Sequence, residues 1–351
     1  MVSKGRILLA PLDWGLGHAT RCIPIAHQLE RHGFEVFFAT NGRALRLLMS
    51  EFPNRHFIKL EEYNIRYSKN GNMAVSMLLQ SLKIWRTIRA ENRQLNSLID
   101  DYQIEGVISD NRYGLYSKKV PCMFITHQLT IQTPVLGSFI KSINFKFIKK
   151  FSECWIPDNP QQSLSGRLSD AEACPIKCKH LGGVSRFKAM TKTDELEILA
   201  VLSGPEPQRT LFEKILIEQL SSLNKTSLLV LGKTEDSSSY QIGKLNVIGH
   251  LQTEALNQAM ANASVVICRS GYSTILDLAK LNKKAIFVPT PGQTEQEYLA
   301  SYFYDNKMAF AMRQHQFDLN IALEKVRHVK PIKSEDYYPN WAELFAPFER
   351  K

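Results

Sequence analysis

A turn of small polar residues at 269–274, Arg-Ser-Gly-Tyr-Ser-Thr, has the residue types that bind a phosphate group. It follows an apolar run at 265–268 and opens a segment with helical spacing at 273–281. The start of a helix offers backbone N–H groups and about half a positive charge, and Gly271 lets a ligand approach the backbone. An ordinary capped helix begins with the same residue types, so this turn alone leaves both interpretations open. The side chains of the turn that can donate hydrogen bonds are Arg269, Ser270, Ser273 and Thr274.

Acidic and amide side chains lie close to this turn in the sequence. Asp277 follows it by one helical turn, where it can accept hydrogen bonds from ligand hydroxyls. A second apolar run at 285–288 ends in a Pro/Gly loop, and Glu295 and Gln296 then begin another helix. An acidic acceptor beside an amide is typical of a clamp for sugar hydroxyls. Glu is also favoured at the start of any helix, so a structural interpretation stays open.

A third small-residue turn, Ser-Gly-Pro-Glu-Pro-Gln at 203–208, follows the apolar run at 198–202. Ser203 and Gly204 make this turn a further candidate for anion binding, although each of its prolines removes a backbone N–H donor. A purely structural turn fits the pattern equally well.

The first half of the chain contains a turn suited to proton transfer, Asp-Trp-Gly-Leu-Gly-His at 13–18. His18 opens the next helix and is a candidate general base, while two glycines make the turn flexible. The alternative is a histidine that only hydrogen-bonds at a helix start. Thr20 takes the place of the third glycine of a dinucleotide-binding motif, and no acid follows the second strand, so dinucleotide binding is not expected.

Polar residues also end two further strands of this half. If Asp110 reaches His18, it would fix the imidazole tautomer and raise its basicity. An Asp after a strand is otherwise most often a turn residue. His127 and Gln128 form a third polar cluster, and together with Gly15 and Gly17 they are further candidates for the same site.

Apolar strand runs alternate with helical patterns in both halves, which predicts parallel sheets built from right-handed strand–helix–strand units. We therefore expect an α/β fold of two tandem, doubly wound, Rossmann-like domains facing a cleft, because ligands of such sheets bind beyond the carboxyl ends of the strands. The expected boundaries are 1–160 for the N-terminal domain, 161–194 for a connection and 195–334 for the C-terminal domain. A docked helix is expected near the end, over 335–349.

The chain has 351 residues and a net charge of +10, which nucleic acid, an anionic membrane or phosphorylated substrates would each explain. No run of five or six Lys or Arg and no nucleic-acid-binding motif occurs, so nucleic acid is not an expected partner. Cys174 and Cys178 lack a second pair at zinc spacing, so no metal site is expected, and a reducing cytoplasm fits best. No apolar run reaches 18 residues and a strand begins almost at once, so neither a membrane span nor a signal peptide is expected.

Three of these segments together resemble the GT-B glycosyltransferases of family 28, the group that contains the peptidoglycan N-acetylglucosaminyltransferase, and the wider UDP-glycosyltransferase superfamily. The resemblance is carried by 266–277, by 289–298 and by Gly-Leu-Gly-His-Ala-Thr-Arg at 15–21. It implies a metal-independent hexosyltransferase that uses a UDP-sugar as co-substrate and no cofactor. It also implies that a last helix at 335–351 crosses back to the first domain.

The resemblance implies a role for each candidate. His18, supported by Asp110, would deprotonate an acceptor hydroxyl in the N-terminal, acceptor-binding domain, which gives transfer with inversion. The C-terminal domain would bind the nucleotide-sugar, with the ribose on Asp277. This chain departs from the family there, because Asp277 stands where Glu is usual and Glu295-Gln296 where many relatives have Asp-Gln. The donor-binding residues implied are Arg186, Ser203, Gly204, Arg269, Ser270, Gly271, Ser273, Thr274, Asp277, Glu295 and Gln296.

Two segments, 78–93 and 136–151, mix large apolar residues with Lys and Arg. Either can lie on an anionic membrane beside a lipid acceptor, while a core helix with a solvated basic face fits the same pattern. The membrane interpretation predicts a cytoplasmic enzyme, peripheral on the inner face of the cell membrane, that acts on a lipid or cell-envelope glycan precursor.

Two other functions fit these features. One is a UDP-sugar 2-epimerase of the same architecture, and the other is a non-catalytic protein that binds a nucleotide-sugar or an anionic lipid. The presence of both His18 and Asp110 favours an enzyme over a binding protein.

Overall fold

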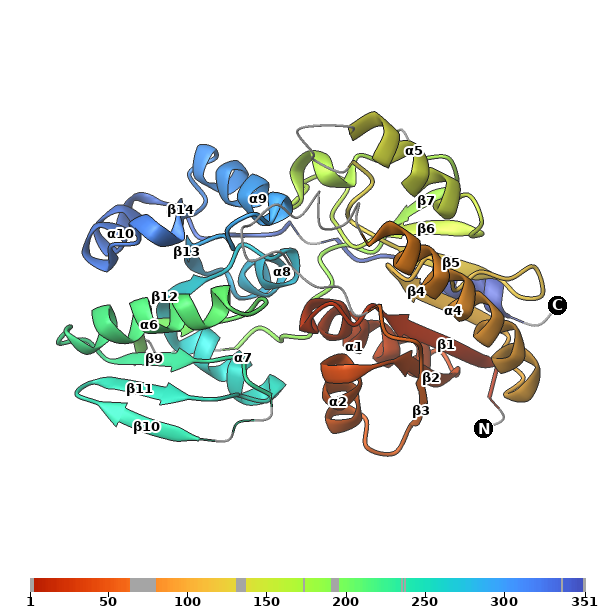
Figure 1. The fold of residues 1–351 in the computed structure, drawn as a ribbon, viewed down its shortest axis with the longest axis horizontal. Helices are drawn as coiled ribbons and strands as arrows, with labels where there is room; N and C mark the ends of the chain where they lie inside the picture. The colour runs from red at the N-terminus through yellow and green to blue at the C-terminus, as the bar shows by residue number, and fades with distance from the viewer. Residues whose placement is uncertain are drawn as a thin grey trace. The chain divides into compact units, whose positions relative to one another are not determined.

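The computed structural model describes residues 3–63, 80–130, 137–172, 174–190, 196–234, 236, 238–335 and 337–349. The chain divides into two compact units (Figure 1). The first holds the described residues up to Val184 together with those from Glu335 onward, and the second holds Ser185–Ser334. Most of the segment 161–194, expected as a connection, thus lies in the first unit, to which it adds an edge strand.

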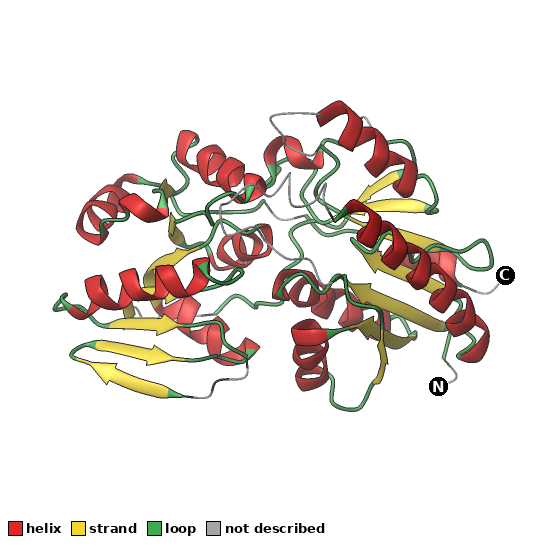
Figure 2. Cartoon of the chain, viewed as in Figure 1, coloured by secondary structure: helices red, strands yellow, loops and turns green. Residues whose placement is uncertain are grey.

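The first unit is built on a seven-stranded sheet in the order β3-β2-β1-β4-β5-β6-β7, with every neighbouring pair parallel. Its helices accompany the strands as the alternating sequence pattern predicts (Figure 2). The strands are β1 (Arg6–Pro11), β2 (Glu35–Thr40), β3 (His56–Lys59), β4 (Gly106–Asp110), β5 (Cys122–Ile125), β6 (Glu153–Ile156) and β7 (Cys178–His180). The helices are α1 (Leu16–Arg31), α2 (Gly42–Glu51), α4 (Ser81–Asp101), α5 (Gly137–Ile148) and the 3₁₀ turn η1 (Gly166–Ser169).

Both faces of this sheet are buried. Alternate residues of β1 enter opposite cores, because side chains of a strand point to opposite faces. Ile7 and Leu9 pack with apolar residues of α1 and α2, whereas Leu8 packs with Leu95 of α4 and Ile148 of α5. The covering helices therefore account for the nearly continuous apolar strands in the sequence.

The C-terminal tail completes the first of these cores. Phe345 and Phe348 lie edge-on or tilted against Phe34 and Trp155. The tail is less helical than expected: α11 covers only Trp341–Phe345, followed by the 3₁₀ turn η4 (Ala346–Phe348). The helix begins there because the Asn340 side chain caps it, accepting a hydrogen bond from a backbone N–H of the first turn.

The second unit contains another seven-stranded sheet, in the order β10-β11-β9-β8-β12-β13-β14. All pairs are parallel except the β10–β11 hairpin, which the sequence analysis missed. The strands are β8 (Leu196–Val201), β9 (Ser227–Val230), β10 (Ser239–Ile242), β11 (Leu245–Ile248), β12 (Ala263–Cys268), β13 (Lys284–Phe287) and β14 (Phe310–Ala311). The helices are α6 (Gln208–Ser221), α7 (Thr253–Asn262), α8 (Tyr272–Leu281), α9 (Thr294–Asp305), α10 (Leu319–Lys325) and the 3₁₀ turns η2 (Gln314–Gln316) and η3 (Val326–His328).

The order of the strands in each sheet determines where the turns with the predicted site residues lie. In the first unit β1, β4 and β5 are consecutive neighbours, so the residues after their carboxyl ends lie at one edge of the sheet. In the second unit the same holds for β8, β12 and β13. The expected two-domain α/β architecture is confirmed. Over the described part of the chain, the helices include none with both the length and the apolar composition to cross a bilayer.

Candidate functional site

His18 and Asp110 meet at the edge of the first sheet. His18 lies in the first turn of α1, Asp110 is the last residue of β4, and Nδ1 of the imidazole is 2.8 Å from a carboxylate oxygen of Asp110. Asp110 is fully buried, whereas the side chain of His18 keeps 19% of its surface exposed. A carboxylate at Nδ1 favours the tautomer that donates there and leaves Nε2 as a base.

Arg21 contacts both members of this pair and was not predicted as a site residue. It lies one turn after His18 on α1, and its side chain is buried. Its guanidinium donates to both carboxylate oxygens of Asp110, with Nε 2.5 Å from Oδ2, and lies 2.8 Å from Nδ1 of His18. A second terminal nitrogen lies 3.2 Å from Nδ1 of His127. An Arg inside an otherwise apolar helix pattern is the signal that could have identified it, because buried Arg requires a partner.

The charges of this cluster shift its protonation equilibria. Burial opposes ionisation of Asp110, but the charges of Arg21 and then His18 outweigh it, and the pKa of the carboxyl lies well below its ordinary value. Burial also lowers the pKa of His18 below its ordinary 6.5, and Asp110 only partly offsets this. The imidazole is therefore neutral at neutral pH, which is the form that can accept a proton.

The other acceptor-side candidates surround this cluster. His127 and Gln128 follow β5, with His127 buried and Gln128 partly exposed. Gly15 precedes α1 with φ of 135°, a conformation that residues with a side chain rarely adopt. Gly17 lies in the first turn of α1. All four thus belong to the edge of the first unit's sheet that carries His18.

A buried ion-pair network anchors the loop between β1 and α1. Arg112, which follows β4, is fully buried and forms ion pairs with Glu91 of α4 and, at 3.3 Å, with Asp13. The hydroxyl of Tyr63 donates to Glu91 at 2.5 Å. Arg112 also donates at 3.0 Å to the carbonyl of Pro11. The loop that precedes His18 is thereby fixed to the sheet and to α4, a role that spacing alone does not reveal.

Three turns of the second unit meet around the start of α8. The hydroxyl of Ser270 donates at 2.6 Å to the backbone carbonyl of Gln296, and the side chain of Gln296 accepts at 2.8 Å from the backbone N–H of Thr290. Gly204 lies beside them, since a Cβ added there would lie 3.3 Å from the hydroxyl of Thr290. Gly271 precedes α8, and a Cβ added there would meet no atom within 4 Å, so the backbone at the start of the helix is accessible.

Thr290 was not predicted as a site residue. Its hydroxyl is buried between these turns and has no hydrogen-bond partner among the described residues. Because a buried polar atom without a partner costs free energy, a ligand oxygen at this position would be a favourable partner. Thr290 lies in the Pro/Gly loop that precedes the predicted site residues Glu295 and Gln296. Its position in that loop would have been enough to predict it as a site residue as well.

Arg269 was predicted as a donor-binding residue, but both terminal nitrogens of its guanidinium bind other groups of the protein. It is buried and donates to the backbone carbonyls of Val288, Pro289 and Gln208 and to the side chain of Gln314. These bonds tie the loop after β13 to the start of α6. The geometry therefore gives Arg269 a structural role, which is to hold these turns together.

The remaining polar candidates of the second unit line α8 and α9. Asp277 is nearly buried on α8 and accepts a hydrogen bond of 2.5 Å from Ser185. Burial raises its pKa to about 6, against the lowering effect of Arg186, whose guanidinium donates to Thr253 at 2.9 Å. Ser273 and Thr274 lie partly exposed in the first turn of α8, as does Glu295 in the first turn of α9, and Ser203 is exposed next to Gly204.

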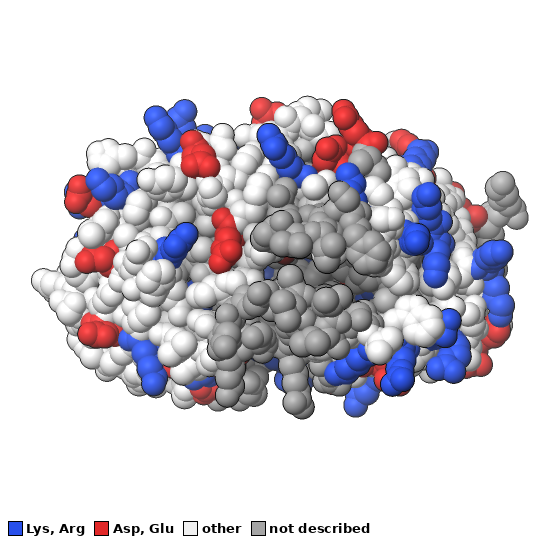
Figure 3. All heavy atoms as spheres, turned by 45° about the horizontal axis from the view of Figure 1, so that its top comes forward, with Lys and Arg blue, Asp and Glu red and all other residues white. Residues whose placement is uncertain are grey.

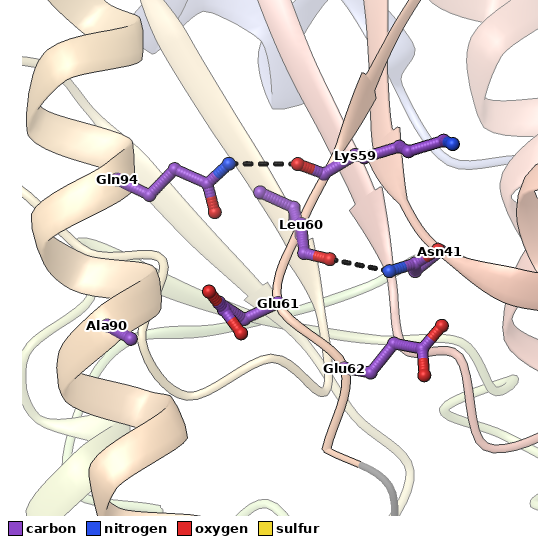
Figure 4. Close-up of a pocket in the computed structure, with 7 residues that line it drawn as sticks. All are labelled: Asn41, Lys59, Leu60, Glu61, Glu62, Ala90 and Gln94. Carbon is purple, nitrogen blue, oxygen red and sulfur yellow. Dashed lines mark hydrogen bonds between the residues drawn. The ribbon is translucent and has the colours of Figure 1, made fainter.

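A cavity of about 530 Å³ in the first unit does not coincide with these candidates (Figure 4). It lies between α4 and the segment after β3, where Gln94 donates to the carbonyl of Lys59 at 2.8 Å. Figure 4 shows the carboxylates of Glu61 and Glu62 directed to opposite sides of their segment. None of the predicted site residues lines this cavity.

The chain is similar to known glycosyltransferases. Residues 200–342 match the glycosyltransferase family 28 C-terminal domain. The chain is 22% identical over 344 residues to the UDP-N-acetylglucosamine--N-acetylmuramyl-(pentapeptide) pyrophosphoryl-undecaprenol N-acetylglucosamine transferase of Histophilus somni (strain 129Pt), covering 95% of this chain and 92% of that protein. It is 25% identical over 317 residues to the transferase of the same name from Yersinia pestis bv. Antiqua (strain Angola), covering 85% and 81%.

Solved structures share the fold over nearly the whole chain. The glycotransferase of kitacinnamycin superposes with a TM-score of 0.63 at 11% identity, covering 93% of this chain and 91% of that chain. Acinetobacter baumannii MurG superposes with a TM-score of 0.53 at 13% identity, covering 93% and 96%. At such identities the likeness concerns the fold, which is GT-B.

Proposed function

We propose that this chain, whose fold is GT-B, is a family 28-like glycosyltransferase that transfers a hexosyl group from a UDP-sugar to an acceptor hydroxyl with inversion. The observation that carries the proposal is the contact between His18 and Asp110 at the end of β4, because it supplies an oriented base. The match of residues 200–342 to the family 28 domain supports the choice of donor class.

In the proposed reaction, Nε2 of His18 takes the proton of the acceptor hydroxyl as the acceptor oxygen attacks the anomeric carbon of the donor. The bond between that carbon and the β-phosphate oxygen breaks, and UDP leaves with the electron pair. A single displacement of this kind inverts the anomeric centre. Asp110 stabilises the imidazolium that forms, and Arg21 holds Asp110 ionised and in place.

The donor is proposed to bind on the second unit at the start of α8. The diphosphate would accept hydrogen bonds from backbone N–H groups beside Gly271, where there is room, and from Ser273 and Thr274. The hydroxyl of Thr290 would donate to the same ligand. These donors and the helix dipole would neutralise the leaving group without a metal ion.

We propose different roles for the polar side chains of this unit, according to the contacts that they already make. Asp277 would bind a ribose hydroxyl through the carboxylate oxygen that Ser185 does not occupy, with Arg186 nearby. Glu295 would contact the donor sugar. Arg269, Ser270 and Gln296 would support the site, because their polar atoms bind neighbouring turns.

The acceptor is proposed to be a lipid or cell-envelope glycan precursor on the inner face of the cell membrane. The relatives named above act, by their names, on a pyrophosphoryl-undecaprenol acceptor. Large apolar side chains on α4 are exposed, namely Leu82 at 72% and Trp85 at 44%, with the guanidinium of Arg89 3.3 Å above the Trp85 ring. Such a basic, aromatic helix surface fits a membrane interface. Part of the predicted segments, 78–79 and 136, lies outside the described residues.

The distribution of charge alone does not identify α4 as a membrane-binding surface. On the face drawn in Figure 3, the Lys and Arg side chains of the described residues are interspersed with Asp and Glu and form no single basic patch. The proposal of membrane association therefore depends on the exposed apolar residues of α4 more than on the net charge of the chain.

Product analysis tests the proposal and separates it from its alternatives. The full chain is incubated with a panel of UDP-sugars, with and without an undecaprenyl-linked glycan acceptor, and both UDP release and the sugar products are followed. A glycosyltransferase releases UDP in proportion to glycosylated acceptor. UDP and an epimerised sugar formed without acceptor would identify an epimerase, and binding without any turnover would identify a binding protein.

A further inference from the structure

Three cysteines of the first unit converge, although they are dispersed in the sequence. Cys154 lies on β6 and Cys178 on β7, and the two residues are direct partners in the register of these parallel strands. Cys174 belongs to the turn that leads into β7, where its backbone N–H donates to the carbonyl of Ala171. The three Sγ atoms all lie within 4.8 Å of one another.

This spacing suits a metal ion bound by thiolates. With metal–sulfur bonds of about 2.3 Å, the sulfurs of a tetrahedral zinc site lie about 3.8 Å apart, so small side-chain adjustments would bring all three within bonding distance. Thiolates select soft or borderline ions such as Zn²⁺ over Ca²⁺ or Mg²⁺, which require oxygen ligands.

The surroundings provide both a rigid base and access for an ion. Cys154 is fully buried in the core that α4 and α5 cover, while Cys174 and Cys178 are partly exposed and pack against the edge of that core. Among the described residues, no His, Asp or Glu joins the three thiols as a fourth ligand. Because Cys174 and Cys178 are partly exposed, solvent has access to a fourth coordination position.

We propose that Cys154, Cys174 and Cys178 form a binding site for a thiophilic metal ion of the Zn²⁺ class, with a solvent molecule as the fourth ligand. Three convergent thiols favour a metal over a disulfide, because any disulfide would use two sulfurs and leave the third beside it. All three are free cysteines. Binding releases the thiol protons to solvent, and neither the metal nor the sulfurs change oxidation state.

The site would have a structural role distinct from glycosyl transfer. β7 is only three residues long and lies at the edge of the sheet, with β6 as its neighbour. A metal bound to all three cysteines would clip β7 and the preceding turn to β6. Because an ion that binds only the folded state stabilises it, Zn²⁺ is expected to raise the melting temperature of the protein.

Metal titration of the reduced, chelator-treated full chain tests this site. We expect one equivalent of Zn²⁺ to bind, and Co²⁺ to give the sulfur-to-cobalt charge-transfer absorption of a thiolate site. Cys174→Ser and Cys178→Ser should each weaken Zn²⁺ binding about a hundredfold or more, at least the cost of losing an outer-sphere partner. Both residues are partly exposed, so these variants should fold. Cys122→Ser, which changes a buried thiol on β5 of the same sheet, is the matched control and should bind Zn²⁺ like the unchanged protein.

Three results would overturn the proposal. The first is the absence of stoichiometric Zn²⁺ binding to the reduced protein. The second is equal Zn²⁺ affinity in the two cluster variants and in Cys122→Ser. The third is a disulfide between two of the three cysteines, found by mass spectrometry of protein isolated without reductant, together with no metal binding after that disulfide is reduced.

Discussion

The candidate site residues of the two units are held in place by different physical means. In the first unit, charged side chains are buried and paired at the sheet edge, with Arg21 against Asp110 and Arg112 against Glu91. In the second, backbone groups and hydroxyls of three turns are held by neutral hydrogen bonds, as between Ser270 and Gln296. The difference suits the proposed tasks, since moving a proton requires a tuned base, whereas a diphosphate requires many donors. Changes in the first unit should therefore affect chemistry and stability, and changes in the second should affect donor affinity.

The largest effect is expected from Asp110→Asn. The amide can no longer hold His18 in the tautomer with Nε2 as a base, and it no longer stabilises the imidazolium. We expect kcat to fall by about a thousandfold or more, as loss of the carboxylate does in a Ser-His-Asp triad, with little change in the Kd for UDP. Steady-state kinetics and calorimetry would measure the two quantities. Asp100→Asn, which changes an exposed carboxylate on α4, is the matched control and should keep full activity.

Arg21→Ala tests stability in the same cluster. It leaves the Asp110 carboxylate buried without its strongest partner, so we expect the free energy of unfolding to fall by about 3–5 kcal/mol. Arg55→Ala removes an exposed partner of Glu30 and should cost at most about 1 kcal/mol. Denaturant unfolding of both variants gives the comparison. Equal losses would show that the buried cluster is no more important to the fold than a surface pair.

Thr290→Val tests the second unit, where the expected effect is smaller. Valine keeps the shape of threonine and removes the hydroxyl that has no partner among the described residues. We expect the KM for the UDP-sugar to rise about two- to tenfold, the effect of one neutral hydrogen bond of about 0.5–1.5 kcal/mol. The melting temperature should stay the same or rise. An unchanged KM would place the donor away from this hydroxyl.

The smallest effect is the pH dependence of the base. Burial lowers the pKa of His18 below 6.5, so the neutral, active form persists to lower pH than for an ordinary histidine. At pH 6 a base with a pKa of 6.5 would keep only about a quarter of its maximal kcat/KM, and this enzyme should keep more. A pH profile of kcat/KM would measure this, and an acidic limb centred above 6.5 would contradict the assignment.

Strands could be predicted from the sequence only where burial leaves an apolar pattern in it. Strands such as β1 were predictable because burial on both faces produces an apolar run. The β10–β11 hairpin was missed because all four residues of β10 are exposed and leave no apolar pattern. The pairing of β6 with β7, which brings Cys154 to Cys178, is likewise invisible in residue spacing.

Side-chain partners were harder to predict than the turns that carry them. Asp110 was considered as a partner of His18 because both follow strands of the same predicted sheet, and the structure places them 2.8 Å apart. Arg21 was overlooked because an Arg in a helix is usually solvated. Arg269 was expected to contact a ligand because of its place in the turn, yet its two terminal nitrogens donate to loop carbonyls and one side-chain amide. The partner that each of these side chains binds depends on packing between segments that are distant in the sequence.

The role of His18 as the general base is tested by measuring donor binding and glycosyl transfer on the same His18→Ala protein. We expect UDP-sugar to bind with unchanged Kd, because the proposed donor site lies on the second unit. Transfer to the acceptor should fall by at least about a thousandfold, no less than in Asp110→Asn, because Asp110 acts through this same base. His27→Ala, an exposed histidine on the same helix, should leave both quantities unchanged. Transfer retained in His18→Ala would contradict the account, as would a loss of transfer fully explained by lost donor binding.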